Sequence, residues 1–158
     1  MELSRRIRTG ETASHISIIF VTAAQLIFFT FFHEYIAWYI TEPDGSVTRL
    51  SMLTDDYFTW LPIMITASIL VMVASIVKII YDNYRFSRTI QIIFNIIGIA
   101  VAVSLVSIFP FDFSVIPNAT AVDVVPIVVT VFLILMAVVY GVSAVVLLVR
   151  LIRSYAVK

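Results

Sequence analysis

The sequence predicts an all-α integral membrane protein, a four-span antiparallel helical bundle (up-down-up-down) with a small extracytoplasmic β-hairpin in the first outer loop. Two observations carry this prediction. Hydrophobic residues make up 61% of the 158 residues and the mean hydropathy is +1.08, whereas an ordinary soluble domain is about 45–50% apolar. Nine of the ten basic residues lie on one side of four long apolar segments, which is the charge pattern of short cytoplasmic loops.

Four segments are long enough to cross a bilayer, for which about 20 mainly apolar residues suffice. They cover approximately residues 14–40, 58–81, 88–109 and 123–153 of a single domain, 1–158. Pro126 falls near the start of the fourth, where a missing N–H costs least. Tyr and Trp favour the membrane interface, and they cluster at the predicted boundaries: Tyr35, Trp38, Tyr39, Tyr57 and Trp60 outside, and Tyr81, Tyr84 and Tyr155 inside.

Charge predicts the orientation, because an even number of spans places both termini on one side. That side carries nine basic and three acidic residues, whereas the other carries Arg49 and seven acidic residues. We therefore expect both termini in the cytoplasm and the chain in the cell membrane. A cleaved signal peptide is the alternative for the first segment, since Arg5, Arg6 and Arg8 precede it. We reject it because the apolar stretch exceeds the about 7–15 residues of such a peptide and no small-residue cleavage site closes it.

The two outer loops differ in kind. Residues 39–50 predict a β-hairpin, because Pro43-Asp44-Gly45 supplies a turn and β-branched residues flank it. A lone hairpin is marginal in water, so we expect this one to lean on the bundle or on a partner. The second outer loop, residues 109–117, contains three Phe, and we expect them to lie in lipid or under the hairpin.

The predicted membrane interior carries no Asp, Glu, Lys or Arg at mid-depth. Such charges usually mark ion pathways and proton relays, so their absence argues against a pump. Amides, hydroxyls and small residues do occur there, several of them at the three- and four-residue spacing that shares one helix face. They supply the candidate intrahelical polar or interface positions, which are Gln25, Ser75, Gln91, Asn95, Gly98 and Gly141.

Two interpretations of these amides remain open. Gln25, Gln91 and Asn95 could surround a polar cavity between the first and third spans that holds a headgroup, water or a small solute. Alternatively, they hydrogen-bond across helix interfaces, where each contributes roughly 0.6–2 kcal/mol. We favour the second interpretation, because amides commonly join helices in this way.

Other chemistry finds little support. There is no Cys, which excludes thiolate ligands and cysteine catalysis, and a net charge of zero argues against a nucleic-acid partner. His33-Glu34 and Asp55-Asp56 could offer metal ligands, but neighbouring residues on a helix point about 100° apart. Neither histidine accompanies a positioned nucleophile. We therefore predict no metal, no cofactor and no catalytic residue.

The leading functional hypothesis is a non-enzymatic membrane protein that works by association, as an accessory or scaffold subunit or as a homo-oligomer. Its expected partners are the lipid bilayer and another membrane protein or a second copy. The alternative is a small channel or transporter with a polar path near Gln25, Gln91 and Asn95. No family signature distinguishes the two.

Overall fold

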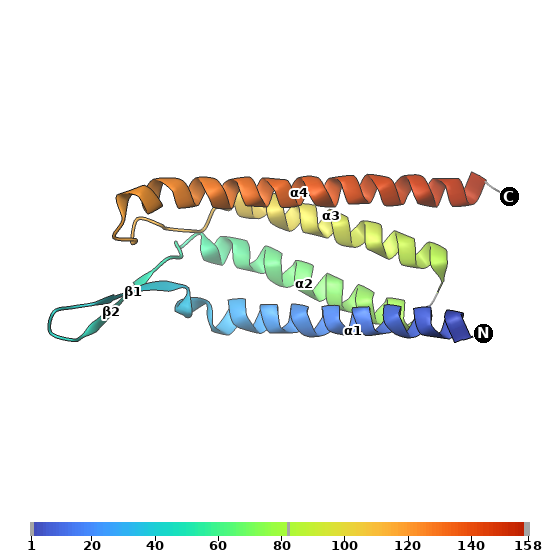
Figure 1. The fold of residues 1–158 in the computed structure, drawn as a ribbon, viewed down its shortest axis with the longest axis horizontal. Helices are drawn as coiled ribbons and strands as arrows, with labels where there is room; N and C mark the ends of the chain where they lie inside the picture. Colours follow the sequence, from blue (N-terminus) through green and yellow to red (C-terminus); the bar gives the residue numbers. More distant parts are fainter. Residues whose placement is uncertain (1, 82, 157–158) are drawn as a thin grey trace.

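The computed structural model describes residues 2–81 and 83–156. It contains four long helices, α1 (Glu2–Phe31), α2 (Tyr57–Ile80), α3 (Tyr84–Ile108) and α4 (Ala119–Ala156), the short 3-10 helix η1 (His33–Tyr35) and a sheet of β1 (Ala37–Thr41) and β2 (Val47–Ser51). The long helices alternate in direction (Figure 1), so both ends of the described chain lie at one end of the molecule and the sheet projects from the other.

Each long helix includes a stretch long and apolar enough to cross a membrane. A helix suits such a sequence because it satisfies its backbone hydrogen bonds within one segment, which hydrocarbon requires. The four predicted spans are therefore found as four helices, and the chain has the build of a multi-pass membrane protein.

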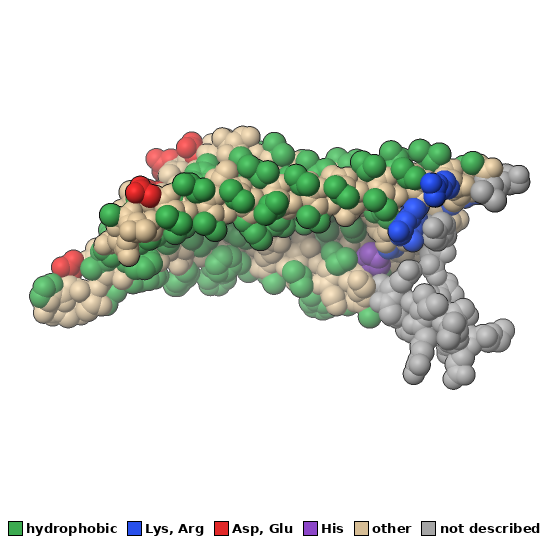
Figure 2. Space-filling model, turned by 45° about the horizontal axis from the view of Figure 1, so that its top comes forward, with side chains coloured by type: hydrophobic (Ala, Val, Ile, Leu, Met, Phe, Trp, Pro, Cys, Tyr) green, Lys and Arg blue, Asp and Glu red, His purple; other side chains and the backbone are tan. Residues whose placement is uncertain are grey.

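Charged side chains gather at the two ends of the molecule. Figure 2 shows acidic side chains at the hairpin end and basic ones at the end that holds the termini. The described basic residues of that end are Lys78, Arg85, Arg88, Arg150 and Arg153. The predicted charge split also rests on side chains that the structure does not describe, which are those of Glu2, Arg5, Arg6, Arg8, Glu11, Asp82 and Lys158.

The first helix ends earlier than predicted, at Phe31 instead of residue 40. The last carbonyls of a helix have no intrahelical donor, and here the surroundings supply donors. The backbone N–H of Phe32 makes the last regular helical bond, to the carbonyl of Phe28, and the Tyr57 hydroxyl donates to the carbonyl of Phe29. Nδ1 of His33 lies 3.2 Å from the carbonyl of Thr30. The apolar residues after Phe31 are thereby released to form η1 and β1.

The fourth helix starts earlier than predicted, at Ala119 instead of residue 123. Oδ1 of Asn118 accepts a hydrogen bond of 3.3 Å from the N–H of Ala121, which is the contact of an N-terminal cap. Pro126 therefore lies inside the helix and not in its first turn. Its missing N–H leaves the carbonyl of Val122 without the usual intrahelical donor.

The hairpin is confirmed, with β1 and β2 antiparallel and Tyr39 opposite Arg49. Gly45 supplies the turn residue with positive φ, at 82°, which glycine adopts without steric cost. The N–H of Glu42 donates to the carbonyl of Ser46 over 2.8 Å and closes the loop. Beyond its base the sheet makes no extensive contact with the described helices, so it does not lean on the bundle.

The loop between α3 and α4 holds the base of the hairpin. The N–H of Asp112 donates to the carbonyl of Met52, and the N–H of Thr54 donates to the carbonyl of Pro110. Pro110 is fully buried. The rings of Phe109, Phe111 and Phe113 pack on one another with centroids 5.7–6.3 Å apart. The three Phe rings thus form a cluster in the loop that is hydrogen-bonded to the residues after the hairpin.

The best-buried core lies at the hairpin end of α2. Tyr57, Trp60 and Met64 are 1%, 4% and 1% exposed, and Phe29 of α1 and Val101 of α3 pack against them. These three residues recur every three or four positions, so they share one face of α2.

The helices pack in chain order, which suits the predicted up-down-up-down arrangement. Extensive contacts join α1 to α2, α2 to α3 and α3 to α4. A closed four-helix bundle would also pack α1 against α4, and no extensive contact of that kind occurs among the described residues. The four helices therefore form an open array, with α1 and α4 at its two sides (Figure 1).

The bond from Tyr57 to Phe29 predicts a stability effect. Removing the hydroxyl in Tyr57→Phe leaves a helix-terminal carbonyl without a donor, and we expect the free energy of unfolding to fall by about 1 kcal/mol. Thermal unfolding in a lipid-like detergent measures this change. Tyr39→Phe removes the same atom from an exposed side chain and should change nothing. Equal melting temperatures for the two variants would show that the hydrogen bond from Tyr57 to Phe29 does not stabilise the protein.

The hairpin turn predicts a pH dependence. The side chain of Asp44 accepts hydrogen bonds from the hydroxyl and the N–H of Ser46, at 2.6 and 2.9 Å, and these bonds lower the pKa of Asp44 from its ordinary value. Because the folded pKa is depressed, the turn gains stability above the unfolded pKa and loses it as the pH falls through the folded pKa. Ser46→Ala should raise the pKa of Asp44, as measured by NMR titration of the side-chain carboxyl carbon.

Ser114→Ala is the matched control for this titration. Ser114 makes the same pair of bonds to Asp112, and they lower the pKa of Asp112. The control variant should raise the pKa of Asp112 and leave that of Asp44 in place. An unchanged pKa of Asp44 in Ser46→Ala would show that the turn does not hold the carboxylate.

Candidate functional site

A cavity of about 460 Å³ lies among the four long helices and is partly open. Small-molecule sites in proteins commonly measure about 300–1,000 Å³. All four helices contribute to its lining, which comprises Thr22, Gln25 and Phe29 of α1, Trp60, Met64, Ala67, Ser68 and Val71 of α2, Phe94, Asn95, Ile97, Gly98, Val101, Ala102 and Leu105 of α3, and Leu133, Met136 and Tyr140 of α4. None of these side chains carries a charge.

The open array explains why this cavity is partly open. Extensive contacts close the seams between α1 and α2, α2 and α3, and α3 and α4, while α1 and α4 do not pack extensively on each other in the described chain. The central helices α2 and α3 therefore form the floor, and α1 and α4 form the walls. We call this cavity the α1–α4 groove.

Two amides of the groove lack hydrogen-bond partners. Gln25 and Asn95 lie well inside the apolar stretches Ala13–Phe31 and Arg85–Ile108, and neither side chain hydrogen-bonds to any residue that the structure describes. Gln25 is exposed and Asn95 is half-buried. An amide without a partner costs several kcal/mol in a hydrocarbon environment. The expected amide bonds across the helix interfaces are thus not formed by these two residues.

Trp60 lines the groove, but its unmatched indole N–H is buried and does not face the open space. Its side chain is 4% exposed, and its ring packs edge-on against Phe29 with centroids 5.9 Å apart. The indole Nε1 is buried and has no hydrogen-bond partner among the described residues. The sequence places this residue at the outer interface, where its N–H would meet water, but the structure buries it. The period of three and four residues through Tyr57, Trp60 and Met64 is the signal that could have found it.

Gly98 lets the ring of Tyr140 from α4 lie close to the backbone of α3. A Cβ built at Gly98 would lie 3.0 Å from two ring carbons of Tyr140, so a side chain there would push against the ring. Tyr140 itself lines the groove. The absence of a side chain at Gly98 therefore lets α4 pack close to α3 at this point of the groove.

The remaining candidate positions lie elsewhere. Oε1 of Gln91 accepts a 3.1 Å hydrogen bond from Arg88, and Gln91 lines a second cavity, of about 290 Å³, that also touches Asn95. Ser75 is fully buried, and its Oγ has no partner among the described residues. No neighbouring atom lies within 4 Å of the Cβ position of Gly141, so no other helix packs closely against this residue. Of the six predicted positions, the groove brings together Gln25, Asn95 and Gly98.

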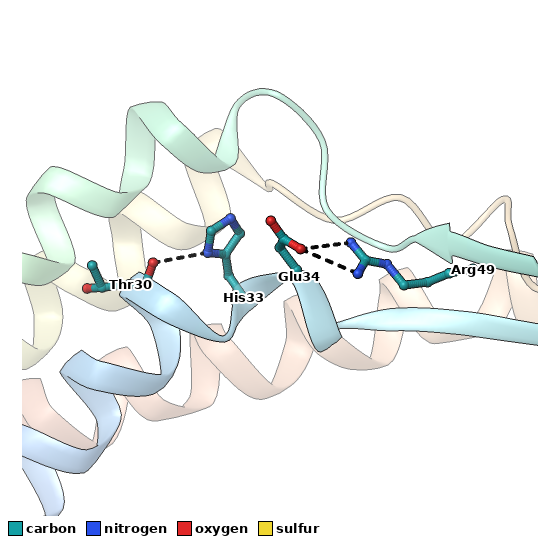
Figure 3. A network of polar contacts seen from close by, with 4 residues as sticks. All are labelled: Thr30, His33, Glu34 and Arg49. Atoms are coloured by element: carbon teal, nitrogen blue, oxygen red, sulfur yellow. Dashed lines mark hydrogen bonds and ion pairs between the residues drawn. The ribbon is translucent and has the colours of Figure 1, made fainter.

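His33 and Glu34 have separate partners, as their adjacent positions predict. Figure 3 shows the imidazole beside the carbonyl of Thr30, while the carboxylate of Glu34 lies 3.5 Å from Arg49 of the hairpin. The imidazole ring also stacks on Tyr57 with centroids 5.2 Å apart. These two side chains therefore connect α1 to α2 and to the sheet.

Comparison with known protein families, with curated proteins and with solved structures finds no match to this chain.

The contact between Gly98 and Tyr140 predicts a difference between the two helical glycines. Gly98→Ala should destabilise the protein by about 1–3 kcal/mol, the usual range for added atoms in a packed site. Gly141→Ala should cost nothing, since its Cβ meets no neighbour. Thermal unfolding of both variants in the same detergent tests this prediction. Tyr140→Ala combined with Gly98→Ala should recover part of the loss, and a failure to do so would place the strain elsewhere.

Proposed function

We propose that this chain is a non-enzymatic integral membrane protein that works by association, as an accessory or scaffold subunit or as a homo-oligomer. The single observation that carries the proposal is the hairpin of β1 and β2. It extends beyond the ends of the helices (Figure 1) and makes no extensive contact with the four long helices in the described chain. A free, projecting sheet is a suitable element for contact with another molecule.

The surface of the hairpin supports this role. Trp38, Tyr39 and Val47 are 37%, 50% and 62% exposed, and aromatic side chains are enriched in protein interfaces. Both outer edges of a two-stranded sheet carry unpaired backbone groups that can pair with another chain. The ion pair of Arg49 and Glu34 is solvent-exposed, and such pairs contribute little stability. Since an isolated hairpin is marginal in water, a partner would stabilise it.

We propose that the hairpin lies outside the cell membrane and that both termini lie in the cytoplasm. The charge split supports this orientation, because the basic side chains that the structure describes, other than that of Arg49, lie at the end of the termini, and the acidic side chains that it describes lie at the hairpin end (Figure 2). Short loops rich in Lys and Arg remain on the cytoplasmic side. A reporter fused to the C-terminus and a second one inserted beside Gly45 would report the two sides.

Transport is the second candidate function. Asn95 lines both the α1–α4 groove and the smaller cavity beside Gln91, so uncharged polar groups follow one another along α3. This arrangement suits passage of a neutral solute better than passage of an ion, since none of the residues lining these two cavities is charged.

Purification of the tagged chain from its native membrane tests association. We expect a defined assembly, with a second protein or a second copy, in a native mass measurement. Changing Trp38 and Tyr39 together to Ala should reduce recovery of this assembly at least tenfold without lowering the melting temperature, since about 2 kcal/mol from two interface aromatics is a modest hot spot. Val142→Ala on the exposed face of α4 is the control.

Two outcomes would contradict the proposal. One is recovery of the chain from its native membrane as a monomer without a companion. The other is an assembly whose mass is unaffected by the hairpin variant. Solute uptake by liposomes that contain the purified chain alone would favour transport instead.

A further inference from the structure

We infer that the end of the molecule that holds the termini binds the headgroup of an anionic phospholipid, through four arginines of α3 and α4. They are Arg85, Arg88, Arg150 and Arg153, and we call them the arginine patch. Figure 2 shows basic side chains at this end. The inference rests on the proposal that the four helices cross a membrane, and it does not depend on association through the hairpin.

Contacts between α3 and α4 fix how these antiparallel helices are aligned. Gly98 of α3 lies against the ring of Tyr140 of α4. Two turns nearer the termini, Gln91 of α3 and Leu147 of α4 line one cavity. The number of residues between the two positions is the same on both helices, so equal steps along α3 and α4 lead to residues that lie level with each other.

The same alignment brings the arginines of the two helices to matching depths. Arg88 comes level with Arg150, and Arg85 comes level with Arg153. The guanidinium carbon of Arg85 lies 4.4 Å from the ring centroid of Tyr155, which agrees with this placement. Because residues three apart lie on one side of a helix, the patch consists of two level pairs of arginines, one turn apart.

The patch continues the side of α3 and α4 that carries the small cavity beside Gln91. Arg88 donates to Oε1 of Gln91 over 3.1 Å, and Gln91 lines that cavity with Ser143. Arg150 follows Ser143 by two helical turns, so both residues lie on one face of α4. An amide also has two N–H donors, so Gln91 can donate to an ester carbonyl below a headgroup that the arginines bind.

Arginine is well suited to a phosphate group, because its planar guanidinium presents parallel N–H donors that bind two phosphate oxygens at once. Arg150 and Arg153 make no hydrogen bond or ion pair with any residue that the structure describes, so their donors are available. Like charges at neighbouring positions repel one another, and a bound anion offsets this repulsion. A phosphodiester at the level pairs meets both conditions.

The surroundings of the patch favour a lipid over a soluble anion. Val149 and Ile152 accompany Arg150 and Arg153 on α4, and they are 42% and 58% exposed. A soluble phosphate would contact only the guanidinium groups, whereas a lipid also covers the apolar side chains with its acyl chains. The 38 residues of α4 measure about 57 Å, compared with about 30 Å of hydrocarbon, so its last turns can reach the headgroup layer.

Lipid retention by the purified chain tests the inference. The chain in mild detergent is mixed with equal amounts of dioleoyl-phosphatidylglycerol and dioleoyl-phosphatidylcholine, which differ in headgroup charge but share their acyl chains. A native mass measurement then counts the lipids bound to each chain. We expect one phosphatidylglycerol per chain, bound about 25-fold tighter than phosphatidylcholine, since each of two arginines near an anionic headgroup adds about fivefold.

Arginine variants separate a built site from general attraction between charges. Arg88→Gln combined with Arg150→Gln should lower the preference to below about fivefold. Changing the same two residues to Lys keeps the charge but removes the paired donors, and it should lower the preference as well. Arg49→Gln at the hairpin end is the control and should change nothing. Arg85→Gln combined with Arg153→Gln keeps the test decisive if the first variant fails to fold.

Three results would overturn the inference. The first is equal binding of the two lipids by the unaltered chain. The second is a preference that the Gln variants leave in place or the Lys variant fully retains, which describes diffuse attraction between charges. The third is displacement of the lipid by millimolar glycerol 3-phosphate, which would assign the patch to a soluble anion. None of these results involves the hairpin variants, so failure of this inference is distinguishable from failure of the association proposal.

Discussion

Hydrocarbon offers no hydrogen bonds, and the architecture of this chain depends on that constraint. Backbone N–H and C=O groups inside a bilayer have to find partners within the protein, so the apolar segments fold as helices. The constraint is most demanding where a helix ends. At the end of α1 the Tyr57 hydroxyl and the His33 ring meet the carbonyls of Phe29 and Thr30, and this arrangement fixes where the chain leaves α1, how α1 meets α2 and where the sheet begins.

The side chains of the groove meet the same constraint differently. The backbone around Gln25 and Asn95 is helical and satisfied, but their amides and the indole of Trp60 have no partner in the described chain. Hydrogen bonds directly between helices would have satisfied the amides and closed the interface. Instead the array stays open between α1 and α4. The packing order therefore explains both the unmatched groups and the space beside them.

Much of the fold follows from the sequence, because length, apolarity and turn chemistry are local properties. The four helices, the hairpin around Gly45 and the packing in chain order are all predictable in this way. The end of α1 is not, since residues 32–40 are apolar enough to continue a span, and the contact of Tyr57 with the last turn of α1 joins residues far apart in the sequence. For the site, periodicity identifies Gln25, Asn95 and Gly98. Periodicity could also have placed Trp60 on the buried face of α2, but it cannot reveal that Gly141 faces open space, because that depends on how far apart the helices lie.

The order of helix contacts has a consequence for how the protein is made. Every extensive helix contact in the described chain joins neighbours along the sequence. Helices α1 and α2 can therefore enter the bilayer as one antiparallel pair, and α3 and α4 as another, without waiting for distant segments to be synthesised. Contacts between sequence neighbours form quickly because little loop entropy opposes them. The final step is then the meeting of two preformed pairs along the α2–α3 seam, which leaves the space between α1 and α4 unfilled when biogenesis is complete.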